Sequence, residues 1–501
     1  MSAFSAGRQY AKGRPETLDL HADVVVLGGG AGGAGMALSL AEAGLRVIVL
    51  ESGRHWEPSD FRPKTSWALK NLYTGRIPEP STGNTVVTVP SGRGVGGSTL
   101  INSAICFRTP PDVLKDWRDN YGCEFFTDAH MSRQFDRLWP MLGIMENPPA
   151  VQGENNKAFR EGVLKLGLPG AWMPRNAPGC TGCGVCQLGC PTGGKATVDR
   201  TLLGAAYETG NVAVYECCRA DAVETQGDRV LALSGAQLDP ETAKEVGSFR
   251  VTADRFVVAC GALGSPRFLL KNGLADSHCG EHLHLHPAAG VVARFPRVIA
   301  PWQGVTQGYW VDRREEGYIL QTYLLTPDQY YLSLQHRMGS PLNGLISDLR
   351  NLGSAGPLVH DEDSKGTVGL RGLSYVLGQG DRRKLIQGMR ETVRVFLAAG
   401  ATDVFPNIAE GQPIRNASEI EARLPLSRPS RDIYVYASHP MGTCRMHGDA
   451  AEGVVDPMGR VHGWANLHVA DASVFPTSLG LNPQITVMSI AMTLGEAIAA
   501  A

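Results

Sequence analysis

Short apolar runs separated by glycine-rich turns dominate the first fifty residues. Residues 24–27 form a continuous apolar run that predicts a buried strand, and residues 46–50 predict a second one. Between them, residues 36–43 have the composition of a helix, and Gly44 follows where a helix C-cap is expected. This order predicts a strand–helix–strand unit of a parallel α/β sheet.

The turn after the first strand carries a dinucleotide-binding pattern. Gly28, Gly30 and Gly33 satisfy G-x-G-x-x-G, and Glu51 ends the second strand. The first glycine makes the turn, the second lets a pyrophosphate approach the backbone, and the third lets helix and strand pack. The helix N-terminus then offers free N–H groups to the phosphates, and Glu51 accepts hydrogen bonds from ribose hydroxyls. By itself this segment fits FAD and NAD equally.

Bulk composition narrows the class of protein. At 501 residues the chain is long enough for two domains, with 43% hydrophobic and 19% charged residues. The net charge of −2, without a block of like charges, gives no support for a nucleic-acid partner. The first twenty residues lack the apolar core of an export signal, and no run of 18 apolar residues occurs. We therefore expect a cytoplasmic protein, or one exported together with a signal-bearing partner.

Four cysteines are spaced as cluster ligands. Cys180, Cys183, Cys186 and Cys190 form C-x2-C-x2-C-x3-C followed by Pro191, the spacing of bacterial iron–sulfur ferredoxins. Structural zinc uses two ligand pairs set well apart, and disulfides are disfavoured in a reducing compartment. The pattern predicts a 4Fe–4S cluster, with a three-iron cluster or metal-free thiols as alternatives.

Longer blocks carry a family resemblance. SGRGVGGSTLIN (91–102), CGALGSPRFLLKNGL (260–274), YASHPMGTCRM (436–446) and residues 454–499 resemble, in order, the glucose–methanol–choline (GMC) family of flavin oxidoreductases. GEHLHLHP (280–287) and the cysteine block resemble its long-chain-alcohol oxidase branch. The resemblance implies an α/β fold with a Rossmann-type FAD-binding domain over 1–110, 196–290 and 435–501. Residues 111–175 would connect to the substrate domain and supply its helices, 176–195 would hold the cluster, and 291–434 would form an antiparallel-sheet substrate domain.

The same resemblance assigns further residues to the FAD site. The glycines of 94–97 leave a loop without bulk that can lie against a flat ring. Asp471 stands at the end of an expected strand, where open α/β sheets bind ligands. Besides Gly28, Gly30, Gly33 and Glu51, the expected FAD contacts are Arg93, Gly97, Ser98, Asn102, Val223, Asp471, Ala472, Asn482 and Pro483.

His439 and Asn482 are the candidates for chemistry. A neutral imidazole accepts a hydroxyl proton near pH 7, and an amide N–H₂ can hold the substrate oxygen. The family carries a His and a second His or Asn at the matching positions. The expected reaction is oxidation of an apolar or aromatic alcohol, with electrons leaving through the cluster. The expected partners are the alcohol, an electron-acceptor protein such as a cytochrome or another redox carrier, and a small partner subunit.

The sequence also fits other interpretations of the reaction and of several residues. The enzyme could instead use oxygen as its acceptor, or be a non-redox lyase in which FAD is structural. His282, His284 and His286 alternate and would share one face of a strand, as in a metal site. The aromatic residues of 302–331 suit either a substrate wall or ordinary sheet packing, and 353–366 is predicted to be a surface loop.

Overall fold

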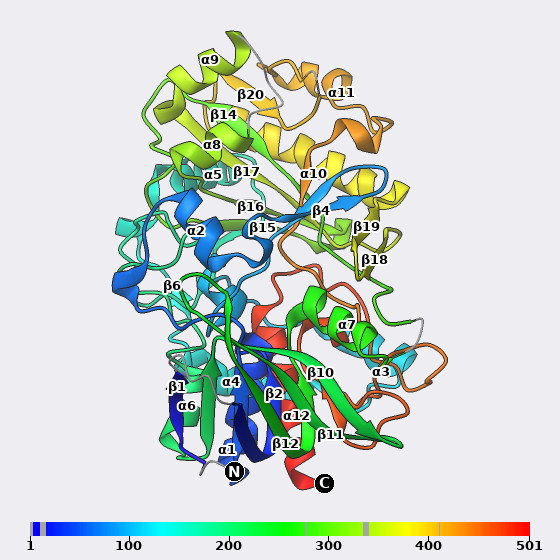
Figure 1. Cartoon of the computed structure of the whole chain (residues 1–501). Helices are drawn as coiled ribbons and strands as arrows, with labels where there is room; N and C mark the ends of the chain where they lie inside the picture. The colour runs from blue at the N-terminus through cyan, green and yellow to red at the C-terminus, as the bar shows by residue number, and fades with distance from the viewer. Residues whose placement is uncertain (1–3, 11–16, 276–277, 334–339, 410) are drawn as a thin grey trace.

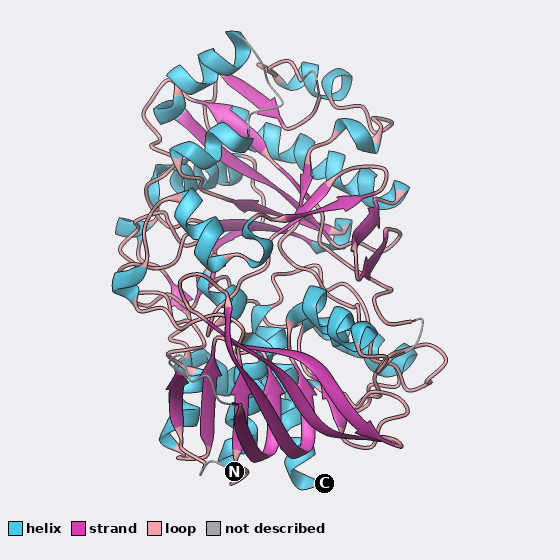
Figure 2. Cartoon of the chain, in the orientation of Figure 1, coloured by secondary structure: helices cyan, strands magenta, loops and turns pink. Residues whose placement is uncertain are grey.

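A computed structural model describes residues 4–10, 17–275, 278–333, 340–409 and 411–501. Two sheets lie one above the other, with both chain ends near the lower sheet (Figure 1). The strands of the lower sheet fan out together, and those of the upper sheet cross a separate layer with its own helices (Figure 2). The helices, in chain order, are α1 (Ala31–Glu42), α2 (Thr65–Leu72), α3 (Pro111–Tyr121), α4 (Asp128–Met141), α5 (Gly153–Lys165), α6 (Leu202–Glu208), α7 (Gly261–Lys271), α8 (Pro327–Ser333), α9 (Ser340–Ser347), α10 (Gln379–Ala398), α11 (Ile420–Arg423) and α12 (Gln484–Ala500).

The lower sheet joins three distant parts of the sequence. Its strands, in spatial order, are β1 (Gly7–Tyr10), β9 (Val212–Glu216), β3 (Val47–Leu50), β2 (Leu18–Leu27), β12 (Glu245–Val258), β11 (Arg229–Leu238) and β10 (Cys218–Gln226), with β22 (Leu467–Val469) also paired to β12. Pairing is parallel from β1 to β12 and antiparallel through β11 and β10. β22 runs parallel to β12, so the carboxyl ends of β2, β3, β12 and β22 meet at one edge. That edge is where such sheets bind ligands.

Small residues allow α1 and α12 to pack closely. A Cβ on Gly35 would lie 3.0 Å from the backbone oxygen of Met488, and one on Gly495 would lie 2.8 Å from Cβ of Ser39. Both helices are largely buried; α1 packs on β2 and β3 of the lower sheet, and α12 packs on α1 and α4. This contact ties the C-terminal segment, which carries Asn482, to the glycine turn at the start of α1.

The upper sheet is mostly antiparallel. Its strands, in spatial order, are β18 (Lys365–Gly369), β19 (Gly372–Val376), β4 (Glu79–Thr82), β5 (Val87–Val89), β21 (Val435–Tyr436), β13 (Ala288–Ala289), β17 (Leu352–Val359), β16 (Tyr318–Thr322), β15 (Tyr309–Arg313) and β7 (Gly170–Trp172). β14 (Val291–Arg294) and β20 (Asp403–Pro406) extend it beside β17, and β6 (Met145–Glu146) pairs separately with β8 (Pro174–Arg175). Two of its pairings, β19–β4 and β21–β5, are parallel. The predicted substrate-domain sheet is thus present, and it also takes in β4 and β5 from the N-terminal part of the chain.

One prediction about this sheet is wrong. Residues 353–366 were expected to be a surface loop, but β17 covers Leu352–Val359 and is buried along its whole length. Its glycines, serine and alanine read as a loop in sequence, yet small side chains suit a strand covered on both faces. A Cβ on Gly356, for instance, would lie 2.1 Å from the backbone oxygen of Ala289.

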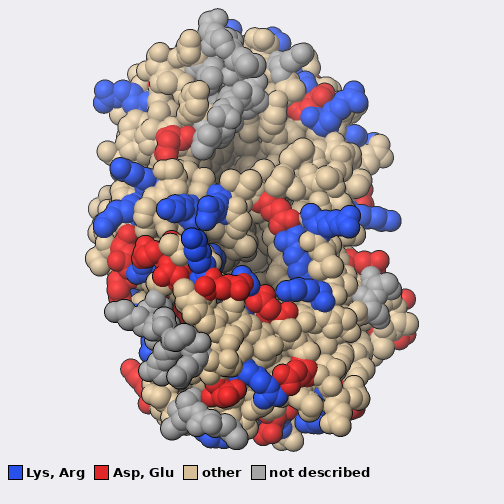
Figure 3. Space-filling model, viewed as in Figure 1, with Lys and Arg blue, Asp and Glu red and all other residues tan. Residues whose placement is uncertain are grey.

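Within the described parts of the chain, no helix is both long and apolar enough to cross a membrane. The face shown in Figure 3 is hollowed near its centre, between the levels of the two sheets, and charged side chains of both signs lie around the hollow.

Candidate active site and cysteine loop

The glycine turn between β2 and α1 is as tight as its pattern predicts. A Cβ on Gly28 would lie 2.3 Å from the oxygen of Ala259, and one on Gly33 would lie 1.9 Å from the oxygen of Gly28. Gly30 is the N-cap of α1, and no side chain caps this helix end. The first turn of α1 therefore keeps N–H groups for a ligand, as a dinucleotide pyrophosphate requires.

Glu51 lies beside this turn. Its Oε2 accepts from the N–H of Gly29 at 2.9 Å, and its Oε1 accepts from Gly53 at 2.8 Å and Gly94 at 3.3 Å. Burial raises the pKa of Glu51, although these N–H groups act in the opposite direction. A carboxylate has about four acceptor positions, so Glu51 retains capacity for a ribose hydroxyl.

The loop 93–102 closes over the same turn. Gly97 has φ +52°, and a Cβ there would lie 2.7 Å from Cα of Gly30. Arg93 donates to the oxygen of Ser52 at 3.0 Å, whereas the exposed Ser98 accepts through Oγ from its own loop. Asn102 donates to Oε1 of Gln484 at 2.9 Å. The loop thereby meets the start of α12, next to Pro483, its N-cap residue.

Asp471 also reaches the turn, and Ala472 follows it as the first residue of a short 3₁₀ turn. A Cβ on Gly32 would lie 2.0 Å from the oxygen of Ala470, so the chain entering Asp471 packs on α1. Asp471 accepts from the N–H of Gly261 at 2.8 Å and from the hydroxyl of Ser265 at 2.5 Å, and burial raises its pKa. Its buried carboxylate holds β22 and α7 together at the ligand edge.

Val223 stands apart from this group. It lies in β10 opposite Leu233, five residues beyond Cys218, whose N–H donates to the oxygen of Glu51 at 2.8 Å. The part of β10 beside Glu51 is therefore Cys218, and the FAD contact assigned to Val223 stays a prediction.

His439 and Asn482 lie side by side. Nε2 of His439 is 3.1 Å from Nδ2 of Asn482, and its Nδ1 is 3.3 Å from Nδ1 of His286. Burial lowers the pKa of His439 to about 4, so the ring is neutral at pH 7. The two predicted catalytic side chains, 43 residues apart in the chain, are thus brought into contact.

His286 is a site residue that the sequence analysis did not assign to the reaction. It is fully buried with φ +52°, and its Nε2 accepts from the N–H groups of Leu479 at 3.2 Å and Gly480 at 2.9 Å. Asp361 accepts from the His286 N–H at 3.2 Å and from the Ser478 hydroxyl at 2.8 Å. His286 and Asp361 therefore fix the segment that leads into Asn482. The alternating histidines that drew attention to this region do not lie on a strand.

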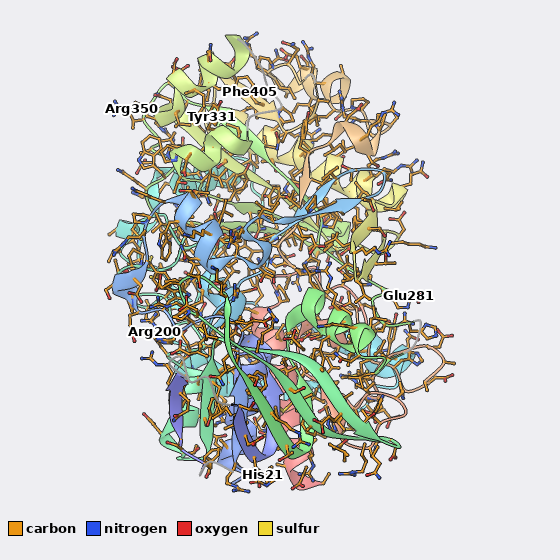
Figure 4. All side chains as sticks on the ribbon, viewed as in Figure 1. His21, Arg200, Glu281, Tyr331, Arg350 and Phe405 are labelled. Atoms are coloured by element: carbon orange, nitrogen blue, oxygen red, sulfur yellow. The ribbon has the colours of Figure 1, made fainter. Side chains whose placement is uncertain are left out.

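The cysteine loop, residues 180–190, lies between the two sheets. Arg200, labelled in Figure 4 at the level where the sheets meet, donates to the oxygen of Gly193 at 2.9 Å, directly after the loop. Cys186 and Cys190 are 9% and 8% exposed, Cys180 is half-buried, and Cys183 is exposed. The pKa of Cys183 is raised by burial and also by its neighbours Cys186, Cys190 and Cys180. The four thiols therefore lie within electrostatic reach of one another.

Two buried cations contact this loop. Arg175, fully buried, places Nη2 3.4 Å from Sγ of Cys186 and Nη1 3.8 Å from Sγ of Cys180. Lys195, 1% exposed, donates from its backbone N–H to Sγ of Cys190 at 3.3 Å. Burial alone would raise the pKa of Cys186, but the positive charges of Arg175 and Lys195 hold that pKa below its ordinary value. The sequence analysis missed both cations.

Lys195 also joins the cysteine loop to the loop over the glycine turn. Its Nζ donates to the oxygens of Leu100 at 2.9 Å, Asn102 at 2.9 Å and Cys186 at 3.1 Å. Neither Lys195 nor Arg175 forms an ion pair with a carboxylate of the described residues. One side chain thus links the predicted cluster ligands to the predicted flavin loop.

Of the four thiols, all of which the structure describes, no three lie within 4.8 Å of one another. Among the described residues, only His278, Glu281 and His282 form a group of three ligand atoms within 4.8 Å of one another. Four thiolates on one zinc ion would lie only about 4 Å apart, because Zn–S bonds are about 2.3 Å long. In a cluster, each thiolate binds a different iron and the sulfurs lie further apart.

Comparison with known proteins identifies the family. The GMC oxidoreductase family matches over residues 22–288 with its N-terminal part and over 363–491 with its C-terminal part. An uncharacterized GMC-type oxidoreductase of Mycobacterium tuberculosis is 32% identical over 95% of this chain and 75% of its own length. A long-chain-alcohol oxidase of Arabidopsis thaliana is 30% identical over 95% of this chain and 68% of its own.

Solved structures agree on the fold. Pyridoxine 4-oxidase from Mesorbium loti superposes with a TM-score of 0.71 at 19% identity, covering 95% of this chain and 98% of its own. A formate oxidase variant of Aspergillus oryzae gives 0.67 at 16% identity, covering 96% and 98%. The predicted fold is confirmed. The chain belongs to the GMC oxidoreductase family and is a FAD-dependent oxidoreductase.

Proposed function

We propose that this enzyme oxidises an apolar alcohol to an aldehyde or ketone, with His439 as the base and Asn482 holding the substrate oxygen. Electrons then leave through an iron–sulfur cluster on Cys180, Cys183, Cys186 and Cys190 to an external carrier. The observation that carries the reaction is the contact of His439 with Asn482, at 3.1 Å, in a partly buried position beside the segment that enters α12.

His439 has the charge state that the reaction needs. With its pKa lowered to about 4 by burial, the imidazole keeps a lone pair for the hydroxyl proton at neutral pH. Such a base contributes roughly 10²–10⁴ in rate. FAD, when bound, takes up the hydride that leaves the alcohol carbon.

His286 controls which nitrogen of His439 carries the proton. Because Nε2 of His286 accepts two N–H groups, a neutral His286 has its proton on Nδ1, facing Nδ1 of His439. The proton of a neutral His439 then lies on Nε2. A half-turn of the Asn482 amide lets Oδ1, which otherwise has no partner among the described residues, accept it. Proton uptake at Nε2 therefore requires the Nδ1–Nδ1 contact to open as the alcohol enters.

An apolar substrate fits the surroundings of Asn482. Leu481 belongs to a cluster of buried apolar side chains with Ile105, Phe107, Met173, Ile319 and Leu358. Trp310 packs on Phe107 with 4.7 Å between ring centroids. This cluster lies next to the catalytic amide in sequence and in space. The long-chain-alcohol oxidases of Arabidopsis thaliana among the relatives support the same substrate class.

Charge balance supports the cluster. Arg175 and Lys195 are buried cations without a carboxylate ion pair, and an unpaired buried cation is costly. Cys186 and Cys190 each raise the pKa of Lys195 more strongly than the carboxylate of Asp199 does. Four thiolates around an oxidised 4Fe–4S core carry about two negative charges, which the two cations neutralise. Four neutral thiols would leave both cations uncompensated.

The alcohol reaction is tested by anaerobic mixing of the purified enzyme with aliphatic, aromatic, sterol and sugar alcohols. Apolar alcohols are expected to bleach the flavin absorbance. Substrate consumption without bleaching would instead select the non-redox lyase.

The cluster is tested by iron and acid-labile sulfide analysis after anaerobic purification. About four of each per chain are expected for a 4Fe–4S cluster. Iron near zero would refute the cluster and leave the flavin reaction standing. Peroxide release equal to alcohol consumed would then identify oxygen as the acceptor, as in the oxidases among the relatives.

A further inference from the structure

The cysteine loop reaches the surface through one ligand. Cys183 is exposed, whereas Cys186 and Cys190 are buried. Cys183 pairs with Gly304 as an isolated bridge, and the Gly304 N–H donates to the oxygen of Gly182 at 2.7 Å. The most accessible thiol therefore lies where the loop meets residues 302–304.

The segments around Cys183 contain no charged side chain of their own, although the exposed Arg200 contacts Gly193 at the end of one of them. Three segments meet there: 147–153 (NPPAVQG), 176–194 (NAPGCTGCGVCQLGCPTGG) and 298–304 (VIAPWQG), none with an acidic, basic or histidine residue. Two backbone contacts and one side-chain contact join them: Val305 to Val151 at 2.9 Å, Gly304 to Gly182 at 2.7 Å, and Asn147 to Ala177 at 2.8 Å. We call their exposed members the uncharged patch: Pro148, Pro149, Ala150, Pro178, Gly179, Thr181, Cys183, Thr192, Val298 and Gln303.

The patch lacks charged residues, whereas 19% of the residues of the whole chain are charged. The exposed Glu146 and Glu154 flank the first segment, 147–153, and so lie just outside the uncharged patch. Its residues are small, so another protein can come close to Cys183 without displacing long side chains. Close approach without strong binding is what a transient electron-transfer encounter requires.

We propose that the uncharged patch is the docking surface for a one-electron carrier protein, with Cys183 at its centre. This inference rests on the proposed cluster. Oxidation of one alcohol to the aldehyde or ketone releases two electrons and two protons. Each encounter passes one electron from the cluster to the carrier, for example reducing one ferric haem to ferrous. Two encounters therefore balance one turnover, and the protons leave to solvent.

The absence of charge predicts how this contact behaves. When opposite charges steer two proteins together, the association rate falls steeply as the salt concentration rises. Docking on an uncharged patch lacks that dependence. A new charge of either sign at the patch would then slow transfer, because it must be desolvated without a partner.

The test uses the intact holoenzyme and ferric cytochrome c as the probe. The variants Thr181→Glu, Thr181→Lys, Gln303→Glu and Gln303→Lys place either charge on the patch, and Thr225→Glu is a control on exposed β10. The enzyme is reduced anaerobically with its alcohol, and cytochrome reduction is followed by stopped flow at low and high salt. Because Gln303 lies outside the cysteine loop, its variants should keep the iron even where those of Thr181 lose it.

We expect all four patch variants with wild-type iron to reduce cytochrome c at least tenfold more slowly. Flavin bleaching by alcohol should be unchanged, Thr225→Glu should match wild type, and wild-type rates should change little with salt. The docking surface would be overturned if iron-loaded patch variants reduced cytochrome c at the wild-type rate. It would also be overturned if the wild-type rate fell steeply as the salt concentration rose. A patch charge that instead dissociates a dimer, with cytochrome reduction unaffected, would also overturn it in favour of a second copy of this chain. Iron-free wild-type enzyme would refute the proposed cluster itself.

Discussion

Replacing Lys195 separates the electrostatic role of this residue from its structural one. The side chain is 1% exposed, and its Nζ donates to the oxygens of Leu100, Asn102 and Cys186 at 2.9, 2.9 and 3.1 Å. Lys195→Met removes the charge and all three hydrogen bonds, whereas Lys195→Gln removes the charge and keeps an amide donor. Lost hydrogen bonds destabilise the protein whether or not iron is present. Only the lost charge matters differently with iron, because four thiolates on a cluster would carry more negative charge than the iron-free thiols.

The burial of Lys195 sets the expected change in melting temperature. Breaking one side of a buried, paired charge costs about 3–5 kcal/mol. Unfolding entropy for a chain of this size makes 1 kcal/mol worth roughly 1 °C in the melting temperature. Lys195→Gln should therefore lower the melting temperature of iron-loaded enzyme by about 3–5 °C more than that of iron-free enzyme.

Differential scanning calorimetry on anaerobic iron-loaded and iron-free samples measures both shifts. The exposed Lys70 on the neighbouring α2 provides the control, and Lys70→Gln should shift both samples by less than about 1 °C. Equal shifts for Lys195→Gln in the two samples would refute the reasoning, because iron would then add no negative charge that Lys195 neutralises.

Three further changes probe the flavin site. His439→Ala should slow anaerobic flavin bleaching by roughly 10²–10⁴ while FAD stays bound, and unchanged bleaching would contradict its role as base. Because burial lowers the pKa of His439 to about 4, bleaching should be level from neutral pH down to about pH 5 and fall as the pH drops through 4. A fall centred near pH 6.5, the ordinary histidine value, would mean that another group titrates. Gly97→Ala places a Cβ 2.7 Å from Cα of Gly30 at φ +52°, so the purified protein should contain little FAD. Gly204→Ala, where a Cβ meets no atom within 4 Å, should keep it.

The nucleotide half of the molecule was predictable because its signals are local. Strand, glycine turn, helix and Glu51 follow one another within thirty residues, and backbone sterics leave few alternatives for Gly28 and Gly33. The pairing of His439 with Asn482 came from the family resemblance, because nothing local joins residues so far apart in sequence. The structure supplies the physical link: α12 packs on α1 and carries the segment before it to the glycine turn.

The rest depends on long-range contacts that composition does not reveal. β17 contains glycine, serine and alanine, which suggested a loop, and only its neighbouring strands β13, β14 and β16 show why small residues are needed. Arg175 and Lys195 look like ordinary surface cations in sequence, since such side chains are rarely buried. Their position against the cysteine loop becomes visible only in three dimensions. His286 was noticed for its alternation with two other histidines, but its contact with His439 is a property of the fold.

The most direct test of the central claim is anaerobic rapid mixing of the enzyme with a long-chain primary alcohol, unlabelled or deuterated at the carbon that bears the hydroxyl. If His439 and Asn482 hold that alcohol for hydride loss, the flavin bleaches in a single turnover and bleaches several-fold more slowly with the deuterated alcohol. Bleaching at equal rates would place the slow step elsewhere, and aldehyde formed while the flavin stays oxidised would contradict the account.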